Sequence, residues 1–256
     1  MKTIEPKLAE RRRNVSEDRA RRRLRWILVT ILAVAVGVVG FWLIRSPLLS
    51  ISTVTYTNVV RSNPSAVMTE LGVGIGSPTI DVDAGAITSA VESDPWVDEA
   101  VVSIGWPGTI VIEVIEHVPA APARADGDWV MLSAATTVVG PTAEPSTTDL
   151  VIDIDQGRVE EGTSIDDPLT VGAVAFAGAL REDLAVGAVI YVEGDGLFAT
   201  VVGHTVRLGR PVDLAEKAVV LAALIDQGLD PDATIDVIAP TRPAVRNPQP
   251  EVEPEE

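Results

Sequence analysis

Nineteen consecutive residues without a charged side chain, from Trp26 to Ile44, constrain this chain more than any other feature. As a helix rising about 1.5 Å per residue, this segment reaches roughly 28 Å, close to the ~30 Å hydrocarbon core of a bilayer. Trp26 and Trp42 stand near its two ends, where amphipathic rings favour the membrane interface. The segment has no polar face, which argues against a buried helix of a soluble protein. It predicts one membrane-spanning helix.

The charges around this segment are distributed unevenly. Residues 1–25 carry ten Lys and Arg but only four Asp and Glu, and basic flanks remain in the cytoplasm. The other 231 residues hold ten basic and 33 acidic groups. We therefore expect a cytoplasmic N-terminus and a strongly acidic exported part, whose surface argues against nucleic acid as a partner. The basic head has a second interpretation, as a site for nucleic acid or anionic lipid headgroups, but orienting the helix already explains it.

A cleaved signal peptide is the alternative interpretation of the apolar segment. Signal peptides usually have a shorter apolar region followed by a small-x-small cleavage site. The sequence RSPLLSIST after Ile44 contains no such site. We therefore expect the anchor to be retained. The chain has no cysteine, so it has neither disulfides nor thiol chemistry.

Residues 50–117 predict a module with the order β-α-α-β-β. Residues 51–56 alternate between apolar and polar side chains, as a half-buried strand does. Asn63-Pro64 supplies an N-cap and a first helical residue, and Asp83 is placed to cap a second helix. That helix is expected to end before Pro95.

The clearest hairpin of the chain completes this module. Residues 97–104 and 110–115 are β-rich runs, and a proline-glycine pair lies in the connection between them. This pair predicts a type II turn in which Gly108 has a positive φ. Trp96 and Trp106 flank the hairpin, and we expect both rings to anchor the core.

From Pro119 to Ala239 the pattern changes to short strands with two helices, so the fold class is α+β. The second helix begins at Asp213 with the spacing of a capping box, because Glu216 lies three residues on. Residues 240–256 are proline-rich and acidic without an apolar period, which predicts disorder. Strands are expected at 129–132, 150–154, 188–192, 197–202, 205–208 and 234–238, and helices at 168–181 and from 213 to Gly228.

No set of residues in the sequence supports catalysis. The two histidines, His117 and His204, lie far apart, and no Ser, His, Asp or Glu group has the spacing of a nucleophile or a metal site. The paired carboxylates Asp81/Asp83 and Asp153/Asp155 are explained by helix capping and by the outward face of a strand. We therefore expect no catalytic residue, no cofactor, no metal and no small-molecule substrate.

Two stretches resemble the FtsQ/DivIB family of bacterial cell-division proteins. Residues 94–121 (DPWVDEAVVSIGWPGTIVIEVIEHVPAA) are similar to the end of that family's POTRA domain, with its Pro-Trp-Val, Trp-Pro and Glu-x-x-Pro-x-Ala landmarks. Residues 206–245 resemble the family's C-terminal strand, lysine-bearing helix and last strand. The resemblance divides the chain into a cytoplasmic head (1–25), a membrane helix (26–44), a POTRA domain (47–118), a β-domain (119–239) and a tail (240–256). The region 136–187 could not be matched residue by residue.

This resemblance implies a scaffold of the division septum and not an enzyme. Such a protein binds FtsB/DivIC-like and FtsL-like partners outside the cytoplasm, and a partner segment adds to the sheet edge at the last strand. Lys217 matches the family's lysine, and we expect it to pair with Asp213 on the helix surface. On this chain the implied docking residues are Thr234, Ile235, Asp236, Val237, Ile238 and Pro240.

Two other classes of protein stay open. A membrane-tethered enzyme acting on the cell wall would need a converging polar cluster, which the sequence lacks. A POTRA-bearing transport component would carry several POTRA repeats or a barrel of alternating ten-residue strands, and neither pattern is visible.

Overall fold

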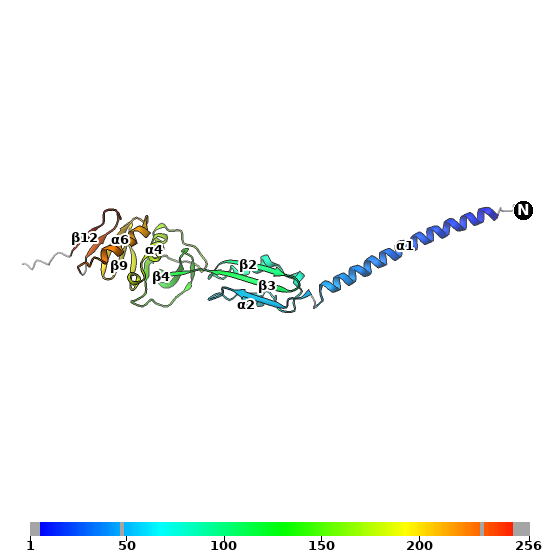
Figure 1. Ribbon diagram of the computed structural model, residues 1–256, viewed down its shortest axis with the longest axis horizontal. Coiled ribbons are helices and arrows are strands. Elements are labelled where there is room, and N and C mark those ends of the chain that lie inside the picture. The colour runs from blue at the N-terminus through cyan, green and yellow to red at the C-terminus, as the bar shows by residue number, and fades with distance from the viewer. Residues whose placement is uncertain (1–5, 47–48, 231–232, 248–256) are drawn as a thin grey trace, which may run out of the picture. The chain divides into compact units, whose positions relative to one another are not determined.

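The computed structural model describes residues 6–46, 49–230 and 233–247, and Figure 1 gives the labels of the elements. Contacts divide the chain into two compact units. One consists of residues 1–55, 68–84 and 102–111, and the other of residues 56–67, 85–101 and 112–256. The domain boundaries expected from the sequence stay a prediction, because a division by contacts does not show which segments fold independently.

The N-terminal helix α1 runs from Pro6 to Ile44 and extends well beyond the predicted span on its N-terminal side. Its apolar part, Leu24–Leu43, has a mean hydropathy of 2.5, and none of it is buried. An apolar helix of 20 residues that no protein surface covers fits a single-pass membrane anchor.

The elements that follow α1 have the predicted order β-α-α-β-β. A short 3-10 helix, η2, which the sequence did not predict, lies between the two α-helices. The three strands form a sheet with the order β1-β3-β2, so β3 is central. The elements are β1 (Thr53–Thr57), α2 (Pro64–Glu70), η2 (Thr79–Asp81), α3 (Ala84–Val91), β2 (Val97–Gly105) and β3 (Thr109–Glu116).

Local sequence explains this module well. The Asn63 side chain accepts a hydrogen bond from the Ala66 backbone N–H at 3.2 Å, so it caps α2 as predicted. Ile110, Ile112 and Val114 alternate along β3, and all three are fully buried. A strand whose alternate residues are buried on one face is held in register by that burial.

The turn of the hairpin differs from the prediction in two ways. Gly108 is not among the glycines with positive φ, and the Trp106–Pro107 peptide bond is cis. Gly108 is needed for a different reason: a Cβ there would lie 2.0 Å from the Ser50 carbonyl oxygen. The prediction that Trp106 is a core anchor is wrong, because its side chain is 61% exposed, whereas Trp96 is half-buried.

Glu116, at the end of β3, holds the loop between β1 and α2. Its carboxylate accepts hydrogen bonds from the backbone N–H groups of Val60, Arg61 and Ser62 at 2.8–3.0 Å. The Ser62 hydroxyl donates a further bond at 2.6 Å. Burial raises the pKa of Glu116, but these bonds outweigh that effect and lower it from 4.5 to about 2.

A sheet of nine strands follows, with the order β12-β11-β10-β9-β8-β7-β4-β5-β6. Strands β4, β5 and β6 form an antiparallel group, and β8, β9 and β10 form the predicted meander. Strand β7 is parallel to both β4 and β8, and β11 is parallel to β10. The strands are β4 (Pro119–Ala125), β5 (Asp128–Ser133), β6 (Val138–Pro141), β7 (Val151–Asp155), β8 (Val189–Glu193), β9 (Gly196–Val201), β10 (His204–Gly209), β11 (Thr234–Asp236) and β12 (Ala244–Arg246).

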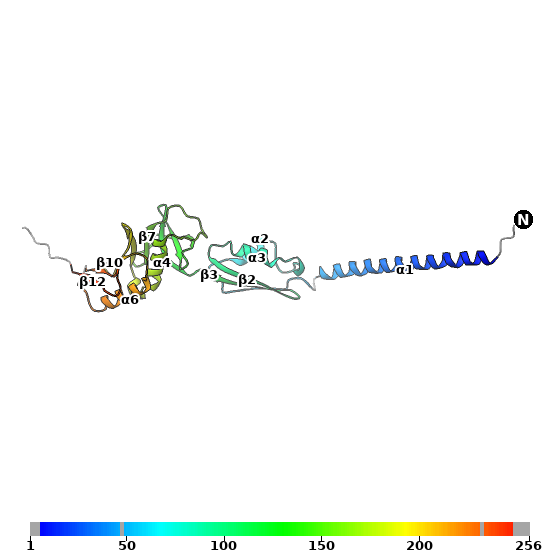
Figure 2. The same ribbon diagram turned by 90° about the horizontal axis from the view of Figure 1, so that it is seen from above.

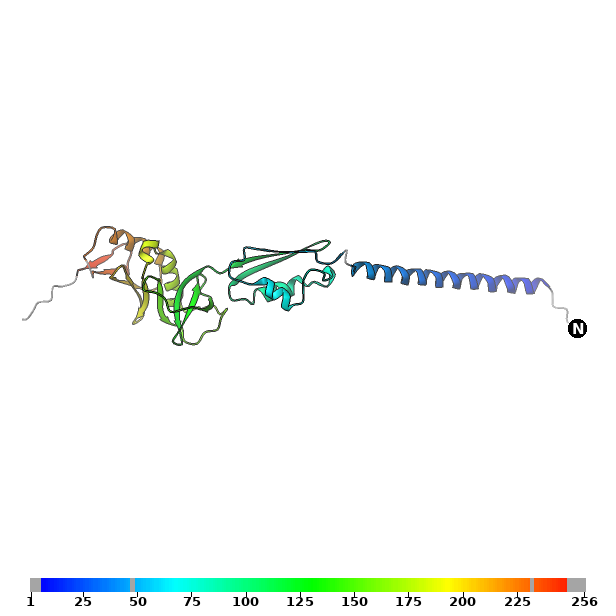
Figure 3. The same ribbon diagram turned by 90° about the horizontal axis from the view of Figure 1, so that it is seen from below.

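Three helices accompany this sheet: α4 (Pro168–Ala179), α5 (Glu182–Ala185) and α6 (Leu214–Ile225). Helix α4 packs on β4, β7, β8 and β9, and α6 lies beside α4 (Figures 2 and 3). Between the helices and the sheet lies one apolar core, which includes Ile152, Phe176, Ile190, Leu197 and Leu221. The predicted fold class, an α+β protein with an N-terminal apolar helix, is therefore confirmed.

Candidate functional site

The strand that was predicted to dock a partner is present and shows the expected alternation. In β11 and the two residues after it, Ile235 and Val237 are fully buried, Asp236 is half-buried, and Ile238 is 45% exposed. The strand pairs in parallel with β10, with Ile235 opposite Val206. The apolar face of this strand therefore belongs to the core. An additional strand would bind through hydrogen bonds to the backbone of this strand.

The prediction that this strand is the last one is wrong. Strand β12 pairs antiparallel with β11, with Val245 opposite Ile235, and forms the end of the sheet. A hydrogen bond from the Arg242 N–H to the Ala239 carbonyl at 2.9 Å accompanies the reversal of the chain between the two strands. The segment expected to be disordered thus contains a strand, whereas residues 248–256 lie outside the described residues. The only signal in the sequence was a three-residue stretch between Pro243 and Asn247, too short to indicate a strand.

Asp236 fixes the position of β11 in two ways. Its carboxylate lies 3.1 Å from the Arg207 guanidinium on β10, and it also accepts a hydrogen bond from the Ile238 N–H at 3.1 Å. Arg207 in turn lies over the Phe198 ring on β9, at 5.8 Å from the ring centroid. A half-buried side chain on β11 therefore connects three neighbouring strands at this end of the sheet.

Lys217 of α6 is buried, contrary to the expectation of a surface ion pair with Asp213. Only 1% of the side chain is exposed, and the ammonium donates hydrogen bonds to the Leu208 and Arg210 carbonyls at 2.8 and 2.9 Å. Burial lowers the pKa of Lys217, and the Asp213 carboxylate opposes that shift. The charge therefore serves to hold the end of β10 against α6.

Asp213 does not act as predicted either. It occupies the N-cap position of α6 with φ 55°, in the left-handed region, and its side chain makes no capping hydrogen bond. The capping box with Glu216 is therefore absent from the helix start. Asp213 stands at the end of a bend at residues 210–213 that connects β10 to α6.

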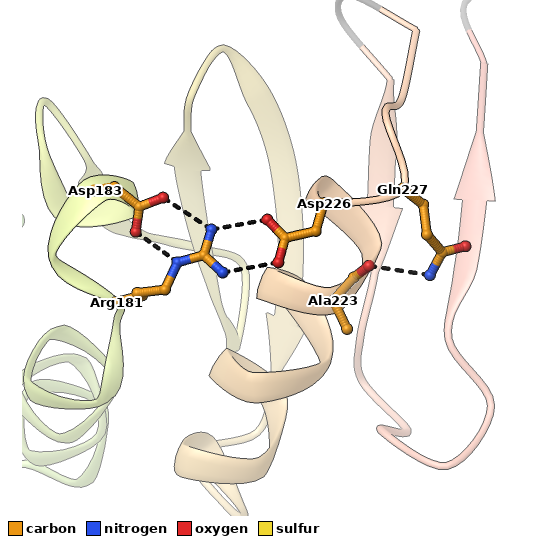
Figure 4. A network of polar contacts seen from close by, with 5 residues as sticks. All are labelled: Arg181, Asp183, Ala223, Asp226 and Gln227. Atoms are coloured by element: carbon orange, nitrogen blue, oxygen red, sulfur yellow. Dashed lines mark hydrogen bonds and ion pairs between the residues drawn. The ribbon is translucent and has the colours of Figure 1, made fainter.

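The other end of α6 is fixed by Arg181. Its guanidinium makes two hydrogen bonds of 2.8 Å to the Asp226 carboxylate and two more, at 2.6 and 2.8 Å, to Asp183 (Figure 4). Bonds from Arg181 lower the pKa of both carboxylates. This network connects the start of α5 with the end of α6, so both ends of α6 are tied to neighbouring elements.

Several of the residues considered for catalysis make structural contacts in the described part of the chain. His117 lies 3.8 Å from Asp98, and His204 is buried in a different part of the chain, its Nδ1 without a hydrogen-bond partner. Residues 6–46, 49–230 and 233–247 contain no group of three His, Asp or Glu placed to hold a metal ion. Among the paired carboxylates, Asp81 pairs with Arg45, Asp153 pairs with Arg124, and Asp155 accepts backbone hydrogen bonds from Asp126 and Gly157.

Comparison with known proteins places the chain among division proteins. Residues 49–117 match the family model of the FtsQ-type POTRA domain. The chain is 30% identical over 229 residues to the cell division protein FtsQ of Mycobacteroides abscessus, covering 86% of this chain and 69% of that protein.

Two further relatives carry the same name. The chain is 29% identical to FtsQ of Mycolicibacterium smegmatis, over 86% of this chain and 63% of that protein. It is 31% identical to FtsQ of Corynebacterium glutamicum, over 52% of this chain and 59% of that protein. The matches thus span about three fifths of the length of these two relatives. On the matched POTRA domain and the identity to the M. abscessus protein, the chain belongs to the FtsQ family of cell division proteins.

Proposed function

We propose that this protein is a non-enzymatic scaffold of the division septum. In this role it links early and late division proteins by binding FtsB/DivIC-like and FtsL-like partners outside the cytoplasm. Membership of the FtsQ family supports a role in division. The apolar helix α1 and the two sheets support a tethered binding protein more than a membrane-bound enzyme, since the described residues include no group of three His, Asp or Glu placed to hold a metal ion.

The proposed topology places the N-terminus in the cytoplasm and the two sheets outside it. The ten basic residues among the first 25 support this orientation. Protease added to intact protoplasts is expected to digest the chain after Arg45 and to spare the head. A mature protein released into the medium, with a new N-terminus near residue 45, would contradict it.

The observation that carries the proposed binding mode is the end of the nine-stranded sheet. Strand β12 is only three residues long, and Ala244 and Arg246 are exposed. At the other end, the backbone of Val138 on β6 is already bonded to residues 162 and 163. A short strand contributes few main-chain bonds, so a longer strand from a partner can compete with it for the same edge.

We infer that the partner strand takes the place of β12 along Thr234–Ile238, with Pro240 limiting the pairing. The backbone of Asp236 supports this geometry. Val237 donates its N–H to the Arg207 carbonyl of β10, and successive N–H groups of a strand point to opposite sides. The Asp236 N–H therefore points away from β10, toward the side on which a partner would pair.

Truncation separates displacement of β12 from addition to it. If the partner displaces β12, a chain that ends at Pro240 binds the partner at least as tightly as the full chain, because no competing strand remains. If the partner pairs with the outer side of β12, the same truncation weakens binding. The affinity of both chains in detergent for the exported segment of the FtsB/DivIC-like protein measures the difference.

Localisation tests the function as a whole. A fluorescent fusion of the full chain is expected to gather at the septum of dividing cells. A fusion spread evenly over the membrane throughout division would contradict the proposed role.

A further inference from the structure

Outside α1, three large apolar side chains are more than half exposed in the described part of the unit that also contains this helix. Ile75 is 77% exposed, Ile80 is 52% exposed and Trp106 is 61% exposed. They stand in three different places along the chain: the turn before η2, η2 itself, and the connection between β2 and β3. Single exposed apolar residues are ordinary on protein surfaces, so the location of this set decides whether it has a function.

Backbone contacts tie all three places to the segment that follows the anchor. Residues 50–52 contact four residues of these places. Each of the three exposed apolar residues lies at most two positions away from one of these four. The Gly76 N–H donates to the Ile51 carbonyl, and the Ile51 N–H donates to the Ser77 carbonyl, both at 2.8 Å. The Ser52 N–H donates to the Gly108 carbonyl at 2.8 Å. A β-bridge joins Ser50 and Pro78. The Thr79 hydroxyl also donates to the Pro107 carbonyl at 2.9 Å, which joins η2 to the hairpin connection.

The path from this segment to the membrane is short. Five residue steps separate Arg45, just after the apolar span, from Ser50, which limits their Cα atoms to about 18 Å apart. A more direct contact joins the Arg45 guanidinium to the carboxylate of Asp81 at 3.3 Å. Arg45 also lies over the Phe41 ring of α1, at 5.0 Å from its centroid. The residue beside Ile80 therefore contacts a side chain located at the end of the membrane span.

We propose that Ile75, Ile80 and Trp106 insert into the interfacial layer of the membrane that α1 spans. This layer is roughly 5–8 Å thick on each side of the hydrocarbon core, and apolar side chains of peripheral segments enter it to a similar depth. A tryptophan ring favours this layer because it combines an apolar body with a polar N–H. The ion pair with Arg45 compensates the one charge beside Ile80, so the surface meets the membrane through apolar contact.

Continuity with the anchor identifies the membrane as the occupant of this surface. The same bilayer surrounds Leu24–Leu43, and the chain reaches the three side chains within a few residues of its end. The contact holds this unit against the bilayer instead of leaving it on a free tether. The inference depends on the membrane anchor alone and holds whether or not the protein is a septal scaffold.

Labelling the full chain in phosphatidylcholine liposomes tests this directly, because the protein contains no cysteine. A single cysteine carrying an environment-sensitive fluorophore is placed at Ile75 or Ile80, and at Val60 as the control. Val60 is 80% exposed but belongs to the other unit. A liposome preparation is used only if a separate label at Val34, inside the membrane span, is protected from quenching by aqueous iodide.

The labels at Ile75 and Ile80 are expected to be quenched by lipids that carry a shallow nitroxide, and to be quenched by iodide roughly threefold less than the label at Val60. Trp106→Ser in the protein labelled at Ile75 is expected to increase iodide quenching, whereas Trp106→Phe preserves the protection. Iodide quenching at Ile75 and Ile80 equal to that at Val60 would overturn the proposal and point to a protein partner for this surface.

Discussion

The Lys217 ammonium lies 2.8 Å from the Leu208 carbonyl oxygen, so a buried charge on α6 holds the end of β10. Strand β10 is the neighbour of β11, and β11 carries the proposed docking residues. The same ammonium bonds the Arg210 carbonyl, two residues further along the turn. A lysine that appears from its sequence position to be a surface residue therefore supports the strand next to the candidate site.

Replacing Lys217 with methionine is expected to destabilise the folded protein by about 1–3 kcal/mol. Methionine keeps most of the side-chain volume but leaves two carbonyl groups without their donor. Urea denaturation followed by circular dichroism measures the change. Glu216→Met is the control, since Glu216 is exposed on the same helix turn, and a loss of stability equal to that of Lys217→Met would contradict the assigned role.

The stability difference between wild type and Lys217→Met is also expected to depend on pH. The pKa of Lys217 is lowered in the folded state, so the folded protein releases this proton before the unfolded chain does. Stability supplied by Lys217 therefore rises with pH between the lowered pKa and about 10.5. A difference that stays constant across this window would show that the ammonium is not desolvated.

Glu116→Gln is expected to lower stability at neutral pH by about 1–2 kcal/mol, after allowance for solvent screening. Its folded-state pKa of about 2 lies below the usual 4.5, so the contribution is present above pH 4.5 and is lost as the pH falls toward 2. Melting temperatures of wild type and variant should therefore converge in acid. Glu113→Gln, an exposed change on the same strand, should show no such convergence.

Gly108→Ala is expected to destabilise the protein by about 1–3 kcal/mol, because its Cβ would lie 2.0 Å from the Ser50 carbonyl oxygen. The backbone of one segment would have to move. Gly74→Ala is the matched control, since a Cβ there meets no atom within 4 Å and its backbone does not require positive φ. Equal melting temperatures for the two variants would contradict the close approach seen at Gly108.

Elements whose signals are local could be predicted from the sequence. The Asn63 cap, the buried face of β3 and the meander β8-β9-β10 all follow from spacing and turn residues, and the structure contains each of them. The partners of Lys217 and Gly108 could not be predicted, because each depends on a backbone segment at some distance along the chain. Whether a lysine is buried, or a glycine is needed for close approach, is decided by that segment.

The candidate site shows the same limit. The alternation predicted that Ile235 and Val237 share one face of the strand, and both are buried in the structure. The pairing of β12 with β11 was missed, since a three-residue strand after Pro243 has almost no periodicity of its own. Strand β12 forms because β11 offers an open edge for pairing. That edge exists only in the folded sheet, so the sequence of residues 244–246 does not reveal it.

Two substitutions at Asp236 test whether a partner strand pairs with the backbone of that residue. Asp236→Ala and Asp236→Pro both remove the carboxylate that pairs with Arg207, but only proline removes the backbone N–H. Calorimetry with the full chain in detergent measures the affinity of each variant for the exported segment of the FtsB/DivIC-like protein. We expect Asp236→Pro to bind about tenfold more weakly than Asp236→Ala, with both variants folded. Equal affinities for the two folded variants would contradict this pairing.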